Sequence, residues 1–67
     1  KIRINCISPG GIFDNQNKKF IKKYSSFCRS NSMLSPSDLN GVIVFLLSDE
    51  SKKITGQNII IDDGFTL

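Results

Sequence analysis

The sequence contains no histidine and no tryptophan, and only one tyrosine, one methionine and two cysteines among 67 residues. The absence of histidine excludes a Ser-His-Asp triad and histidine-ligated metal sites within the chain. Cys6 and Cys28 lie too far apart for the closely spaced pairs of a zinc site or a disulfide framework. We therefore predict no metal site, and we predict that both thiols are free and buried as small hydrophobic residues.

Long apolar runs are also missing, because no stretch approaches the roughly 20 residues that cross a membrane. The chain begins at Lys1 and shows no charged-then-apolar leader, which favours a cytoplasmic piece of a longer protein. Its 39% hydrophobic residues and net charge of +3 are typical of a globular protein. We interpret residues 1–67 as a single partial domain that is marginally stable alone.

The first apolar stretch predicts a strand and a tight turn over residues 1–13. Ile2, Ile4 and Cys6 alternate with polar residues, as in a strand that has one face against a core. Proline and two glycines in residues 8–11 then end the strand, since proline lacks an N–H and glycine tolerates positive φ. The bare glycine backbone would let a flat ligand approach closely.

Residues 14–34 are predicted to form a helix followed by a polar loop. Asp14 is a suitable N-cap for a helix over residues 15–28. One side of this helix is apolar, and the other carries a basic face of four lysines: Lys18, Lys19, Lys22 and Lys23. The run over residues 29–35 is polar and irregular, which indicates a loop.

Residues 35–48 begin with a strong helix signal. Ser35 is predicted as N-cap, Pro36 occupies the first helical position, and Asp38 can reach back to the N-cap. The helix is apolar nearly all round, so it should be covered on two sides. Gly41 in its interior suggests that another backbone comes close there.

The last strand is predicted within residues 57–64. Three consecutive isoleucines at positions 59–61 are typical of a strand covered on both faces of a parallel sheet. The order strand, helix, helix, strand makes parallel pairing through a right-handed crossover the expected α/β arrangement.

Five short motifs together resemble the C-terminal third of short-chain dehydrogenases/reductases. They match in order and spacing over the whole chain. The motifs are INCISPG at 4–10, SPSDL at 35–39, FLLSD at 45–49, ITGQ at 54–57 and IDDG at 61–64. The resemblance implies the C-terminal part of a Rossmann-type parallel sheet.

The resemblance also implies a cofactor site for NAD or NADP. Pro9, Gly10 and Gly11 would form a wall of the nicotinamide pocket, and Ile12 would offer its backbone groups to the carboxamide. Asp14 stands where the family has a threonine that bonds the cofactor. A carboxylate there lacks the hydroxyl donor and adds negative charge near the pyrophosphate.

The implied enzyme passes a hydride between this cofactor and a carbonyl or hydroxyl group of a small-molecule substrate. Residues 14–34 would be the substrate lid, and the last helix and strand would form subunit contacts in a homo-oligomer. Tyr24 is followed by Cys28 where the family's Tyr-x-x-x-Lys pair requires lysine, so no catalytic residue is assigned and the piece should be inactive alone. Asp63 replaces a glycine of the family's Asp-Gly-Gly ending, which requires a negative φ or a tolerated left-handed one.

Two other functions stay open from the residues alone. The four lysines on an amphipathic helix could bind nucleic acid or an anionic membrane, although such lysines are more often a solvated face. The apolar helix and the isoleucine strand could instead act as an association surface. We expect a small-molecule partner, with neither nucleic acid nor membrane.

Overall fold

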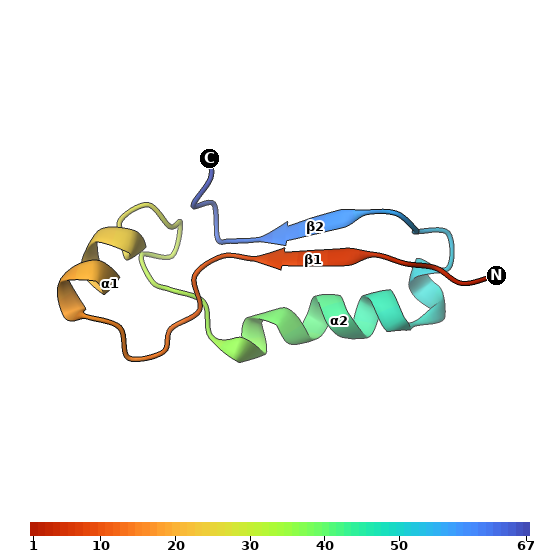
Figure 1. Cartoon of the computed structure of the whole chain (residues 1–67), viewed down its shortest axis with the longest axis horizontal. Coiled ribbons are helices and arrows are strands. Elements are labelled where there is room, and N and C mark those ends of the chain that lie inside the picture. Colours follow the sequence, from red (N-terminus) through yellow and green to blue (C-terminus); the bar gives the residue numbers. More distant parts are fainter.

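The computed structural model describes residues 1–67 and shows two parallel strands lying along one helix, with a second helix at one end (Figure 1). The α/β class and the predicted order of elements are confirmed. The elements are β1 (Cys6–Pro9), α1 (Lys18–Ser25), the 3₁₀ helix η1 (Pro36–Leu39), α2 (Asn40–Leu47), the 3₁₀ helix η2 (Asp49–Ser51) and β2 (Asn58–Ile61).

β1 and β2 form the predicted parallel pair. Cys6 lies opposite Asn58 and Pro9 lies opposite Ile61. The Gly10 N–H donates to the Ile61 carbonyl at 2.8 Å, which extends the pairing to the start of the turn. The two strands therefore end side by side, next to the Pro-Gly-Gly turn (Figure 1).

β1 is shorter than predicted because side-chain contacts interrupt the ladder at its beginning, where the Gly56 N–H still donates to the Ile4 carbonyl at 2.7 Å. The Ile4 N–H donates to the Thr55 hydroxyl at 3.1 Å. The Asn5 side chain donates to the Ile54 carbonyl and accepts from the Gln57 N–H, both at 3.0 Å. These contacts hold the chain extended without regular strand pairing.

The predicted inner face of the first strand is wrong. Ile2 and Ile4 are 88% and 74% exposed, and Cys6 is exposed rather than buried. Arg3 and Asn5, on the alternate face, are partly buried. The reason is that the Arg3 guanidinium donates to the carbonyl of Leu46 in α2 at 3.0 Å, which turns this face toward the helix.

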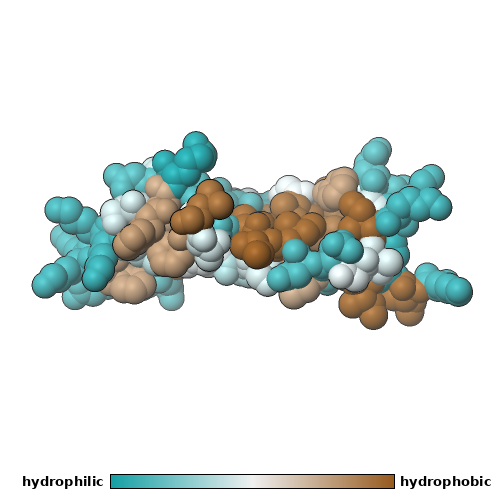
Figure 2. Space-filling view, turned by 90° about the horizontal axis from the view of Figure 1, so that it is seen from above, coloured by the Kyte–Doolittle hydropathy of each residue, from teal (hydrophilic) through white to brown (hydrophobic).

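The prediction that β2 is covered on both faces is also wrong in this chain. Ile59 and Ile61 are partly buried, whereas Ile60 between them is exposed. α2 covers one side of the strand pair, and hydrophobic residues gather along the middle of the opposite side (Figures 1 and 2). A run of three isoleucines does not indicate how many faces are covered.

The predicted start of the second helix is confirmed. The Ser35 N–H donates to the Asp38 carboxylate at 2.7 Å, which completes a capping box with Pro36 in the first turn. A 3₁₀ turn leads directly into α2, which ends at Leu47. The predicted cover is absent, because Leu47 is 81% exposed and no atom lies within 4 Å of a Cβ built on Gly41.

Ser51 and Arg3 bind the C-terminal end of α2. Ser51 is completely buried, and its hydroxyl contacts the carbonyl oxygens of Leu46 and Ser48, each at 3.1 Å. Arg3 donates to the Ser51 hydroxyl at 3.3 Å and to the Ile54 carbonyl at 3.1 Å. The Leu46 carbonyl, in the last turn of α2, thereby accepts from Arg3 before β1 and from Ser51 in η2.

The molecule is elongated and has a small apolar core. Its extents are 47 × 22 × 16 Å, and Cys28 and Leu34 are its only buried hydrophobic residues. The radius of gyration is 14.2 Å. A compact domain of this length would have about 11 Å.

Candidate functional site

The Pro-Gly-Gly turn packs against α1. The Gly11 N–H donates to the Tyr24 hydroxyl oxygen at 2.6 Å. A Cβ built on Gly11 would lie 2.8 Å from Cζ of Tyr24, and one built on Gly10 would lie 2.8 Å from Cβ of Asp62. The glycines are therefore required because the chain's own side chains, including the flat ring of Tyr24, lie directly on the turn.

Ile12 follows the turn and presents a free backbone donor. Its carbonyl accepts from the Gln16 side chain at 2.9 Å. Its neighbours pair with Leu34, through Phe13 N–H to Leu34 carbonyl at 2.7 Å and Leu34 N–H to Gly11 carbonyl at 3.0 Å. The Ile12 N–H has no hydrogen-bond partner within the chain.

The prediction that Asp14 caps the first helix is wrong. The cap is Asn17, whose side chain accepts from the Lys19 N–H at 2.8 Å, and α1 begins at Lys18. Asn15 has a φ of 56°, a left-handed value that prevents a helix from starting earlier. The Asp14 carboxylate is left exposed, beyond the turn.

An aromatic cluster joins α1 to the end of the chain. The rings of Tyr24 and Phe65 stack with centroids 4.2 Å apart, and Phe20 and Phe27 contact this pair at 5.9 and 5.8 Å. Sequence reasoning missed Phe65 as a site residue, because nothing in the local pattern links it to Tyr24. The cluster places α1 against the residues that follow β2.

An open groove of about 490 Å³ runs beside the turn. Of the predicted site residues, Pro9, Gly10 and Gly11 line this groove, whereas Ile12 and Asp14 lie outside it. The other lining residues are Ser8, Tyr24, Asn58, Ile60, Asp62, Phe65 and Thr66. The cofactor contacts of these five predicted residues stay a prediction.

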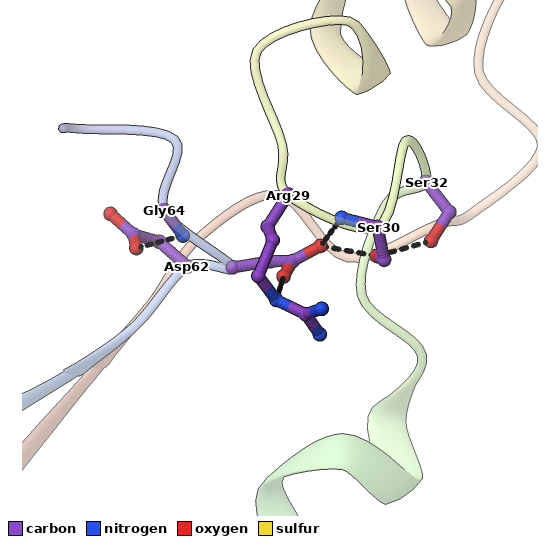
Figure 3. Close-up of polar contacts among 6 residues, drawn as sticks. Arg29, Ser30, Ser32, Asp62 and Gly64 are labelled. Carbon is purple, nitrogen blue, oxygen red and sulfur yellow. Dashed lines mark hydrogen bonds and ion pairs between the residues drawn. The ribbon is translucent and has the colours of Figure 1, made fainter.

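Two adjacent aspartates close the end of β2 through separate contacts (Figure 3). The Asp62 carboxylate accepts from the Thr66 hydroxyl at 2.7 Å and from the Gly64 N–H at 3.0 Å. The Thr66 hydroxyl is the main cause that lowers the pKa of Asp62. This carboxylate therefore stabilises the final turn of the chain.

The Asp63 carboxylate points the other way, toward the loop that follows α1. It accepts from the Ser30 N–H at 3.0 Å and from the Ser30 hydroxyl, and it pairs with Nε of Arg29 at 3.5 Å. The Ser30 hydroxyl is the main cause that lowers the pKa of Asp63. Its φ of 54° confirms that the position accepts a left-handed residue.

The two thiols differ in their surroundings, and both are free. Cys28 is buried as predicted, and burial together with the negative charges of Asp63 and Asp62 raises the pKa of its thiol. Cys6 is exposed on β1. The thiol of Cys28 therefore stays protonated and unreactive at neutral pH.

The predicted basic face of α1 is exposed, since all four lysines are solvent-accessible. Their use in binding nucleic acid or a membrane surface stays a prediction. A bilayer-spanning helix would have to be longer and more apolar than any helix in this structure.

Comparison with known proteins identifies close relatives. Residues 1–66 match the family model described as enoyl-(acyl carrier protein) reductase. The chain is 52% identical to post-translational flagellin modification protein A of Campylobacter coli, in an alignment that covers 98% of this chain and 26% of the relative. It is 34% identical to 7alpha-hydroxysteroid dehydrogenase of Bacteroides fragilis, covering 98% of this chain and 27% of that protein.

Solved structures show the same backbone. The short-chain dehydrogenase of Leptospira borgpetersenii with bound NAD+ matches with a TM-score of 0.93 and 52% identity, over 97% of this chain and 26% of that one. The complex of 4-hydroxyisoleucine dehydrogenase with NADH matches with a TM-score of 0.86 and 35% identity, over 97% and 29% of the two chains. The chain thus spans about a quarter of the length of its relatives. It belongs to the short-chain dehydrogenase/reductase family of Rossmann-fold oxidoreductases, as the five motifs predicted.

Proposed function

We propose that this chain forms one wall of the nicotinamide pocket and the substrate lid of an NAD(H)-dependent oxidoreductase. The enzyme would pass a hydride between the cofactor and a carbonyl or hydroxyl group of a small molecule. The observation that carries this proposal is the likeness to the NAD+-bound Leptospira dehydrogenase, at 52% identity and a TM-score of 0.93. The NADH complex of 4-hydroxyisoleucine dehydrogenase supports NAD(H) rather than NADP(H) as the cofactor.

The backbone of Ile12, directly after the turn, suits the carboxamide group of a nicotinamide ring. The Ile12 N–H is free to donate, and the Gln16 side chain fixes the orientation of the Ile12 carbonyl. The turn before Ile12 carries no side chain larger than a proline ring, because its residues are Pro9, Gly10 and Gly11. When bound, the cofactor supplies or accepts the hydride, while these residues orient its ring.

Asp14 is proposed to contact only donor groups of the cofactor. Its carboxylate is exposed and makes no hydrogen bond within the chain, so it is free to accept. An ionised carboxylate cannot donate, unlike the threonine typical of the family. Its negative charge also repels the pyrophosphate, which weakens cofactor binding.

Residues 14–34 are proposed as the substrate lid, within the partial domain 1–67. The stacking of Tyr24 on Phe65 keeps this segment over the groove beside the turn. We assign no catalytic residue and no metal site to this segment.

The enzyme is further proposed to be a cytoplasmic homo-oligomer whose partner is a small molecule rather than nucleic acid or membrane. The exposed apolar side chains of Val44 and Leu47 in α2 and of Ile60 in β2 support burial against other protein surfaces. The exposed free thiol of Cys6 supports a reducing compartment.

The test is NADH binding by the full-length enzyme, measured by nicotinamide fluorescence. We expect Asp14→Thr to tighten NADH binding by roughly five- to tenfold, because one like charge is removed and one donor is gained. Asp49→Thr, at the start of η2, is the matched control and should leave the affinity unchanged.

Failure of the wild-type enzyme to bind NADH would refute the proposed function. Equal affinity of the wild-type and Asp14→Thr enzymes would show instead that Asp14 does not face the cofactor.

A further inference from the structure

The lid loop and the end of β2 meet at a single residue, Asp63. The Arg29 N–H donates to the Asp63 carbonyl at 2.8 Å. The Ser30 N–H donates to the Asp63 carboxylate at 3.0 Å (Figure 3). The Ser30 hydroxyl donates to the same carboxylate oxygen and also contacts the Ser32 hydroxyl at 3.0 Å. Backbone and side chain of Asp63 thus hold two consecutive residues of the loop.

The backbone conformation at this position does not require an aspartate. Asp63 has a φ of 54°, and glycine adopts such values without strain. The family pattern has glycine here, which preserves the turn but supplies no carboxylate. The neighbouring Asp62 does not replace it, since its carboxylate accepts from Gly64 and Thr66 in the tail. The Asp63 side chain therefore serves the lid contact and not the turn.

Of the two charged partners in this contact, only Asp63 is shielded from solvent. The Asp63 side chain is 13% exposed, whereas the Arg29 side chain is 83% exposed. A largely exposed ion pair at 3.5 Å contributes little, because solvent screens it. The hydrogen bonds from Ser30 to the sheltered carboxylate accordingly carry most of the interaction.

We propose that the Asp63 carboxylate is a positioning group that fixes the lid segment, residues 14–34, against the end of β2. This inference rests on the proposed function of that segment as substrate lid. Tyr24 holds the helix of the lid on the Pro-Gly-Gly turn, and Asp63 holds its following loop at Ser30. Loss of the carboxylate releases Ser30 and loosens the loop, while the helix stays attached and the Arg29 N–H keeps its bond to the backbone carbonyl of residue 63.

The test compares hydrogen–deuterium exchange of the wild-type full-length enzyme with that of two variants. Asp63→Gly keeps the left-handed backbone and removes the side chain, and Asp63→Asn keeps both the backbone and one acceptor. We expect exchange of the amides at 29–32 to accelerate by roughly fivefold in Asp63→Gly, with partial rescue in Asp63→Asn. Glu50→Gln, which removes a carboxylate from η2, is the control and should exchange like wild type.

The location of the change decides the outcome. Faster exchange confined to the lid supports the proposal. Unchanged exchange at 29–32, or an equal acceleration throughout α2, overturns it. NADH titration of the same proteins separates the two proposals: if wild type does not bind NADH the proposed function fails, while the exchange result still decides the role of Asp63.

Discussion

Asp62 and Asp63 show how neighbouring residues of one type acquire different tasks. Their carboxylates accept from Thr66 in the tail and from Ser30 in the lid, respectively. Both pKa values are lowered by these hydroxyl groups. The charge that faces Asp63 is the Arg29 cation, and the nearby thiol of Cys28 is neutral at neutral pH.

These lowered pKa values predict acid destabilisation. A carboxyl group whose pKa is lower in the folded than in the unfolded state stabilises the fold above its unfolded pKa of about 3.9. That contribution is lost as the pH falls through the folded pKa. The midpoint temperature of thermal unfolding should therefore decrease when the pH is lowered below about 4. Thermal melts of the chain between pH 7 and pH 2.5 measure this.

The double variant Asp62→Asn, Asp63→Asn provides the comparison for the pH series. It should show a shallower loss of stability below about pH 4, because neither side chain can then be protonated. An unchanged pH profile would mean that other carboxylates cause the acid loss.

At the scale of elements, local patterns predicted the second helix better than the first. Ser35 and Asp38 form their capping box within four residues, with Pro36 in the first turn, so the signal and its cause lie in one place. The first helix has two possible caps, Asp14 and Asn17, and both match the N-cap preference. The left-handed backbone of Asn15 decides between them, and the residue types around Asn15 do not reveal that conformation.

Gly41 in α2 gives a prediction that depends on what covers the helix. In this chain a Cβ at position 41 would meet no atom within 4 Å, so Gly41→Ala should raise the free energy of unfolding by about 1 kcal/mol through helix propensity. Urea unfolding of the 67-residue chain measures the change. Gly11→Ala is the opposite control, because its Cβ would collide with Tyr24 and lower stability by about 1–3 kcal/mol.

The sign of the change in unfolding free energy shows whether another segment packs on Gly41. Destabilisation of the isolated chain would contradict the open surroundings of this glycine. Destabilisation of the full-length enzyme alone would show that another segment packs closely on α2, as the sequence pattern predicted.

At the scale of the whole molecule, the chain exposes much of its apolar surface. Its elongated shape leaves only Cys28 and Leu34 buried among the hydrophobic residues, and hydrophobic residues gather in the middle of the face seen in Figure 2. Contiguous exposed apolar surface of this kind is typical of protein interfaces. The structure is therefore that of a segment whose sheet and helix are suited to pack against further protein.

This surface predicts self-association of the isolated chain. Sedimentation velocity should show a weight-average mass above that of the 7.5 kDa monomer, and this mass should rise with concentration. Leu47→Glu changes a side chain that is 81% exposed, so it should weaken association without disturbing the fold. A monomer at all concentrations would contradict the prediction.

The sequence alone determined the α/β class, the order of elements, the parallel pairing, the capping box at Ser35 and the family. These features follow from residue types and spacings within short segments or from motifs matched in order. Only the tertiary structure decided that Arg3 rather than Ile4 faces α2, that Tyr24 lies on the glycines, and that Asp63 holds Ser30. The reason is physical, because each of these contacts joins residues distant along the chain, and local periodicity contains no information about which distant partner satisfies a given group.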